Sequence, residues 1–164
     1  MPVERKPLFR AEILSPRAKE LSLGDTVEPA REILRRWARL LASARAEELT
    51  ESELLPDFLT EVFYHVLGYS GPTPAGERYT LSREKRVEVD GKFADAVLGD
   101  LGGARARPLA AIEGKGPRDP LDRPFAGRRM SAVDQAYRYA INLPCDWIVV
   151  TNLREIRLYH KNHD

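Results

Sequence analysis

The hydrophobic pattern divides the chain into a helical first half and a strand-rich second half. Between residues 29 and 46, apolar side chains recur every three or four positions, which predicts one face of a helix that begins at Pro29. A second helix is predicted from the capping box of Thr50 and Glu53 to a stop at Gly68. Residues 1–27 contain three prolines and little periodicity, so we expect an arm with a short strand around residues 9–14.

Short apolar runs separated by turn residues dominate the second half. Extended segments are predicted at residues 79–81, 85–89, 92–98, 108–115, 146–151 and 155–160. Asp90-Gly91 is a hairpin signal, and a helix is predicted from about residue 129 to 142. This order predicts an α/β (α+β) fold in which a mixed β-sheet is flanked by helices.

Two of the predicted strands carry charges where a buried strand should be apolar. Asp95 interrupts the run 93–98, and Glu113 and Lys115 end the run 109–115. An ionised carboxylate in such a strand costs several kcal/mol unless a partner or a metal compensates it. Glu113 and Lys115 share one strand face, and Asp95 joins them if the two strands pair. Two convergent carboxylates suit Mg²⁺, and a lysine beside them can hold a phosphate or an attacking water, as metal-assisted phosphodiester hydrolysis requires.

The charge distribution favours an anionic polymer as the partner of this site. The net charge of the 164 residues is only +1. However, residues 101–130 contain seven basic and three acidic side chains, a local charge of +4, whereas residues 46–61 carry −6. The arginines expected to contact such a polymer are Arg118, Arg123, Arg128 and Arg129. A solvated basic loop is the alternative interpretation of the same stretch.

Cysteine usage and hydropathy indicate the cellular setting. A single cysteine, Cys145, excludes an internal disulfide and zinc-finger spacing and fits a reducing cytosol. No apolar run is long enough to cross a membrane, and the N-terminal residues do not form a secretory signal. We therefore expect a cytoplasmic protein without membrane contact. The chain stops just after a strand-like run, so we also expect a domain cut from a longer protein.

The ordered set of motifs resembles the PD-(D/E)xK nuclease superfamily. It consists of Asp95 on one strand, Glu113-x-Lys115 on the next, a helix with Gln135-x-x-x-Tyr139, and the strand at residues 146–152. More narrowly, residues 50–160 are similar to the N-terminal nuclease domain of type IIG restriction–modification enzymes and of type I restriction subunits. Ala94 departs from the motif, which has proline at that position.

The resemblance implies a fold and a role for each motif residue. It implies a restriction-endonuclease-like αβββαβ core over residues 50–164, with residues 1–49 as an arm and helix packed on it. Asp95, Glu113 and the main-chain carbonyl of Gly114 would be Mg²⁺ ligands, with Mn²⁺ able to substitute. Lys115 would orient or activate the attacking water. Gln135, with Tyr139, would support the site or touch the DNA backbone.

Glu61 has two interpretations. It lies four residues before His65 near the end of the predicted second helix, so the two can form an ordinary surface pair. Alternatively, Glu61 reaches the site as an outer ligand of the metal or of its water.

The resemblance implies an Mg²⁺-dependent DNA endonuclease that hydrolyses phosphodiester bonds in double-stranded DNA. Its expected partners are a fused or separate methyltransferase and a specificity module. A transient dimer is expected, because cutting both strands takes two domains that each hold one site. One alternative is a RecB-like repair nuclease, which shares the Gln-x-x-x-Tyr helix. Another is a non-catalytic nucleic-acid-binding domain in which Asp95, Glu113 and Lys115 are a structural cluster.

Overall fold

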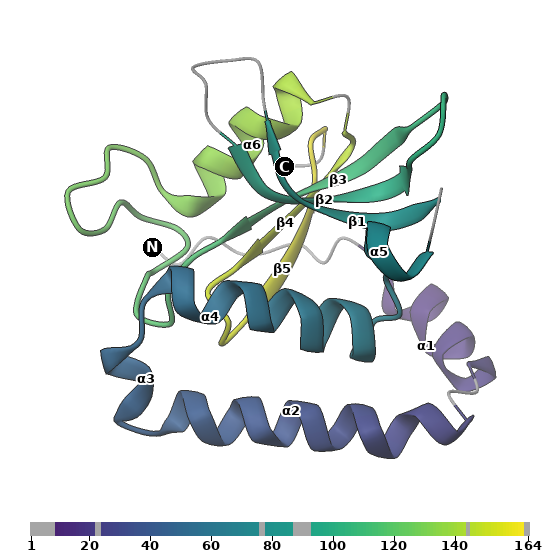
Figure 1. Ribbon diagram of the computed structural model, residues 1–164, viewed down its shortest axis with the longest axis horizontal. Coiled ribbons are helices and arrows are strands. Elements are labelled where there is room, and N and C mark those ends of the chain that lie inside the picture. The colour runs from purple at the N-terminus through teal and green to yellow at the C-terminus, as the bar shows by residue number, and fades with distance from the viewer. Residues whose placement is uncertain (1–8, 22–23, 76–77, 87–92, 144, 163–164) are drawn as a thin grey trace.

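The chain forms a mixed five-stranded sheet with helices on both faces (Figure 1). The computed structural model describes residues 9–21, 24–75, 78–86, 93–143 and 145–162. The strands are β1 (Tyr79–Arg86), β2 (Phe93–Leu101), β3 (Arg107–Gly114), β4 (Trp147–Thr151) and β5 (Ile156–His160). The helices are α1 (Ala11–Glu20), α2 (Val27–Ala42), α3 (Arg45–Glu48), α4 (Glu51–Phe58), α5 (Pro72–Ala75) and α6 (Ala132–Asn142), with a 3₁₀ turn η1 (Gly24–Thr26) and a π-helical segment η2 (Leu59–Val66).

The strands lie side by side in their order along the chain, with β3 in the centre. Neighbouring strands are antiparallel except β3 and β4, which are parallel because α6 returns the chain to the opposite end of the sheet. Ala96 pairs with Ile112 across β2 and β3. Asp95 precedes Ala96 on β2 and Glu113 follows Ile112 on β3. Because the two strands are antiparallel, this register brings Asp95 and Glu113 to the same end of the sheet.

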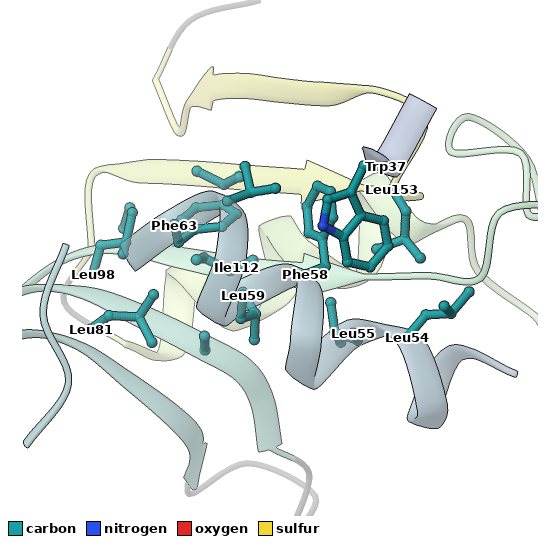
Figure 2. Packing of buried hydrophobic residues seen from close by; sticks show 14 of the residues in the cluster. Trp37, Leu54, Leu55, Phe58, Leu59, Phe63, Leu81, Leu98, Ile112 and Leu153 are labelled. Carbon is teal, nitrogen blue, oxygen red and sulfur yellow. The ribbon is translucent and has the colours of Figure 1, made fainter. Parts of the chain in front are cut away.

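Each face of the sheet has its own hydrophobic core. On one face α4 and η2 pack over β2 and β3, and α2 packs against η2 as an outer layer (Figure 1). Figure 2 shows Trp37, Phe58 and Phe63 in this core. On the other face α6 packs over β3 and β4. Within the ranges that the structure describes, no helix has both the length and the apolarity to cross a membrane.

The predicted N-terminal strand is wrong. Residues 11–20 form helix α1, and Pro16 lies inside it. Most of these residues are good helix formers, and this local preference decides the conformation because none of their side chains is buried in the sheet.

The second helix begins where the sequence predicts and changes character halfway. Thr50 and Glu53 form the complete capping box. After Phe58 the α-helix widens into η2, whose end is marked by the bond from the Leu67 amide to the Val62 carbonyl. Gly68 follows with φ +79°, which confirms it as the stop.

Other boundaries differ from the prediction by a few residues. The extended segments at 79–81 and 85–89 belong to one strand as far as Arg86, and residues 87–89 with the Asp90-Gly91 turn lie outside the described residues. β2 continues beyond residue 98 to Leu101 through an irregularity at Gly99. α6 begins at Ala132 rather than near residue 129, because Ser131 and Asp134 form a second capping box there.

A close contact between α4 and the end of β3 gives a testable prediction. A Cβ atom added at Gly114 would lie 2.5 and 2.6 Å from the two methyl carbons of the buried Leu55. We expect Gly114→Ala to lower the free energy of unfolding by about 1–3 kcal/mol through overpacking. Leu55→Ala in the same chain should relieve the clash, so that the double variant loses less stability than the sum of the single variants in urea unfolding. Simple additivity would contradict the contact.

Candidate active site

The ends of β2 and β3 bring three of the sequence-predicted residues together. The Gly114 amide donates a hydrogen bond of 2.7 Å to Asp95 Oδ2, which ties the carboxylate to the neighbouring strand. Glu113 and Lys115 are 1% and 6% exposed and form an ion pair with each other. The Lys115 amide donates to the Thr151 carbonyl at 2.8 Å, so β4 also fixes this position. The expected convergence of Asp95, Glu113 and Lys115 is therefore observed.

Glu113 is the most constrained group of the cluster. Burial, reinforced by the charge of Asp95, raises the pKa of its carboxyl to about 8, although Lys115 acts in the opposite direction. Burial alone would lower the pKa of the Lys115 ammonium, but the Glu113 carboxylate outweighs it and the pKa is raised. Glu113 Oε2 is a buried atom that has no hydrogen-bond partner among the described protein groups. A buried acceptor without a partner is unfavourable, so this oxygen is suited to a ligand.

Helix α6 adds the two residues of its predicted motif. Gln135 Nε2 donates a hydrogen bond of 2.7 Å to the Tyr139 hydroxyl, as their spacing of one helical turn allows. Burial raises the pKa of the Tyr139 phenol; the Gln135 bond acts in the opposite direction, and the charges of Glu113 and Asp95 raise it further. These electrostatic interactions place the phenol beside the carboxylates.

Glu51 is a site residue that the sequence prediction missed. It is the first residue of α4, and burial raises the pKa of its carboxyl, with Lys115 lowering and Asp95 raising it. Its Oε2 atom is buried without a hydrogen-bond partner among the described groups and lies 3.6 Å from Arg128 Nη2. The spacing of three residues from Thr50 assigns Glu53 to the capping box, but no pattern in the sequence assigns Glu51 to the site. Only the packing of α4 against Gly114 brings Glu51 to the site.

Glu61 bonds to helix α2. The structure therefore shows it neither as an ion pair with His65 nor as an outer ligand at the site. Its two carboxylate oxygens bond to Arg36 Nη2 and Trp37 Nε1 of α2, each at 2.6 Å. The bond from Arg36 lowers the pKa of the carboxyl, with burial acting against it. Glu61 therefore ties α2 to η2, and the acidic side chain that α4 and η2 contribute to the cluster is Glu51.

The four arginines of the basic stretch are not equivalent. Arg128 bonds to Asp119 and approaches Glu51, and Arg118 lies 3.8 Å from Glu47. Arg123 and Arg129 are exposed and form no ion pair with any described residue.

The loop that carries these arginines is anchored to the β4–β5 turn. Asn152 Nδ2 donates to the Asp119 carbonyl at 2.9 Å, and Arg154 Nε donates to the Pro117 carbonyl at 2.9 Å. Asn152 is buried, so its bond to the loop is shielded from water. The two bonds therefore hold the first part of the loop, residues 117–119, against the β4–β5 turn.

The donor set fits a hard divalent cation with few protein ligands. Among the described residues, no three side chains of His, Cys, Asp or Glu come together as a metal-binding group. Asp95 and Glu113 provide two carboxylates, and the partnerless Glu113 Oε2 is available as a ligand atom. Mg²⁺ is commonly bound through one or two carboxylates and completes its shell with water and substrate oxygens.

The raised pKa of Glu113 predicts how stability depends on pH. Between about pH 4.5 and pH 8 the folded state holds a proton on Glu113 that the unfolded chain has lost, so the free energy of unfolding should fall as the pH rises. We expect a decrease on the order of 1–3 kcal/mol in chelator-containing buffer. Urea unfolding at a series of pH values measures it, with Glu113→Gln as the control that lacks this titration. Parallel curves for the two proteins would contradict the prediction.

Comparison with known proteins does not assign this arrangement. No protein-family model matches the chain, and no curated protein and no solved structure is significantly similar to it. The functional argument therefore depends on the geometry and chemistry of the site itself.

Proposed function

We propose that the chain is an Mg²⁺-dependent DNA endonuclease domain and the cleavage module of a restriction–modification enzyme. The observation that carries the proposal is Glu113 Oε2, which has no hydrogen-bond partner among the described residues and is buried beside Asp95 and Lys115 at the end of the central strand. The resemblance of the motif order to the PD-(D/E)xK nucleases points to the same chemistry. The mixed sheet with α6 between two parallel strands is compatible with the restriction-endonuclease-like core that the proposal assumes.

Each residue of the cluster has a role in the proposed reaction. Asp95, Glu113 and the Gly114 carbonyl would hold the metal, which when bound polarises the scissile phosphate and lowers the pKa of a water. Lys115 is a fixed ammonium that can orient the attacking water and stabilise charge on the phosphate. Tyr139, positioned by Gln135, presents a hydroxyl toward the same space.

Double-stranded DNA is the proposed substrate because the basic loop adjoins the carboxylates. Arg123 and Arg129 are exposed and unpaired within the described chain, so their guanidinium groups are available to phosphates. Such contacts position DNA without reading its sequence, which fits a cleavage module that depends on a separate specificity module. A transient dimer would supply the second site for the second strand.

One observation favours a non-catalytic alternative. Glu113 pairs with Lys115, and Asp95 accepts the Gly114 amide, so the charges are partly compensated inside the protein. A structural cluster in a nucleic-acid-binding domain would look similar. Metal binding distinguishes the catalytic site from the structural cluster, because carboxylates that are already compensated inside the protein do not bind a cation.

Metal binding is the first test. We expect the wild-type domain to bind Mg²⁺ or Mn²⁺ in calorimetry and expect both Asp95→Ala and Glu113→Ala to abolish it, since each removes a charged ligand. Asp100→Ala is the matched control, because this exposed carboxylate lies at the opposite end of the same strand. Asp95→Ala and Glu113→Ala should also abolish nicking of plasmid DNA by the full-length protein, whereas Asp100→Ala should not. Equal weak binding by all four proteins would refute the catalytic proposal and favour the structural cluster.

DNA binding tests the role of the loop. Arg123→Gln and Arg129→Gln should each weaken binding to duplex DNA and reduce the slope of log K against log salt by about one, as loss of one phosphate contact requires. Arg105→Gln, which removes the same charge between β2 and β3 at the far end of the sheet, should leave the slope unchanged. Fluorescence anisotropy at several salt concentrations gives the slopes. Equal effects of all three variants would indicate only a general charge effect.

A further inference from the structure

One guanidinium joins two acidic side chains that flank the candidate site. Arg128 Nη1 bonds to Asp119 Oδ2, and Arg128 Nη2 lies 3.6 Å from Glu51 Oε2. The two carboxylates come from separate parts of the chain, since Glu51 begins α4 and Asp119 follows β3. A single cationic side chain therefore pairs with both of them, and the three ionised groups carry a net charge of −1.

The backbone delivers Arg128 to this position through an unusual turn. Ala126 and Gly127 both have positive φ angles, 52° and 78°, and the Arg128 amide donates to the Phe125 carbonyl at 3.1 Å. A left-handed conformation is unfavourable for an alanine, so contacts beyond the turn must stabilise it. The ion pairs of Arg128 are contacts of this kind.

The main chain of Asp119 is held by two hydrogen bonds. Its amide donates to the Gly116 carbonyl at 3.0 Å, and its carbonyl accepts the bond from Asn152. Its side chain is only 10% exposed, whereas that of Arg128 is 39% exposed. The guanidinium of Arg128 therefore lies on the solvent side of the Asp119 carboxylate.

The charges of the cluster match one divalent cation. Four carboxylates, of Asp95, Glu113, Glu51 and Asp119, stand against the two cations Lys115 and Arg128. When all six are ionised, the cluster carries a net charge of −2, which one Mg²⁺ neutralises. Without Arg128 the charge would be −3, and two carboxylates would be left without their cation.

We propose that Arg128 is a built-in counter-ion that occupies the Glu51–Asp119 pair and limits the candidate site to a single divalent cation. This inference rests on the proposed function, because it assumes that Asp95 and Glu113 bind a metal. Arg128 acts as a positioning residue: it holds Glu51 and Asp119 as its own partners and keeps them from serving as ligands of a second cation.

The test is a count of the Mn²⁺ ions bound per chain, measured by calorimetry without DNA at constant pH and ionic strength. The wild type should bind one ion. Arg128→Gln should bind two, because it frees a pair of hard oxygen ligands and makes the cluster more negative. Arg128→Lys keeps the charge and should bind one ion. Arg105→Gln is the matched control for loss of a positive charge, and it should also bind one.

The outcomes separate this inference from the proposed function. One ion in both the wild type and Arg128→Gln, or two ions in the wild type, overturns the inference alone. No binding by the wild type overturns both proposals. Glu51→Gln provides a test that does not alter Arg128: it should still bind one ion, with a dissociation constant within about tenfold of the wild type. Loss of binding in this variant would identify Glu51 as a ligand and overturn the inference.

Discussion

The burial of an acidic side chain at the end of the central strand is the constraint to which the surrounding structure responds. Glu113 lies on β3, which has a hydrophobic core on each face, so water cannot solvate its charge. The lysine two residues later is buried with it and compensates one oxygen. The neighbouring aspartate is held by a main-chain amide, and α6 supplies a phenol. Lys115 stabilises the Glu113 carboxylate, whereas the charge of Asp95 disfavours its ionisation.

The N-terminal half of the chain contributes a further acidic side chain to the cluster through helix α4. Because Gly114 has no side chain, Leu55 can pack directly against the end of β3. That contact sets the height of α4 above the sheet and determines that its first residue, Glu51, faces the cluster. The extra acid would be unfavourable there without Arg128, which approaches Glu51 from the loop and also bonds to Asp119. The site therefore combines charges from a strand, a helix and a loop.

The sequence was sufficient to predict those features that depend on local pattern. The central strand, the capping box at Thr50, and the convergence of Asp95 with Glu113 and Lys115 follow from alternation and spacing, and the structure agrees. The role of Glu51 could not be predicted, because its carboxylate reaches the site only when α4 packs on the sheet, whereas the bond from Thr50 to Glu53 is local. The sequence does not predict the helix at residues 11–20, because Pro16 and the weak periodicity outweigh its helix-forming residues. The different surroundings of the four arginines could not be predicted either, because Glu47 beside Arg118 and Glu51 beside Arg128 lie far away in sequence.

The anchoring of the loop by Asn152 and Arg154 has a consequence for the thermodynamics of ligand binding. A mobile loop loses conformational entropy when it closes on a ligand, and this loss subtracts from the affinity. Here two hydrogen bonds from the β4–β5 turn and the ion pairs of Arg128 have already restricted the backbone during folding. An anion that reaches Arg123 or Arg129 therefore meets a loop that is already partly ordered, and the conformational entropy that binding still removes belongs mainly to the two exposed arginine side chains.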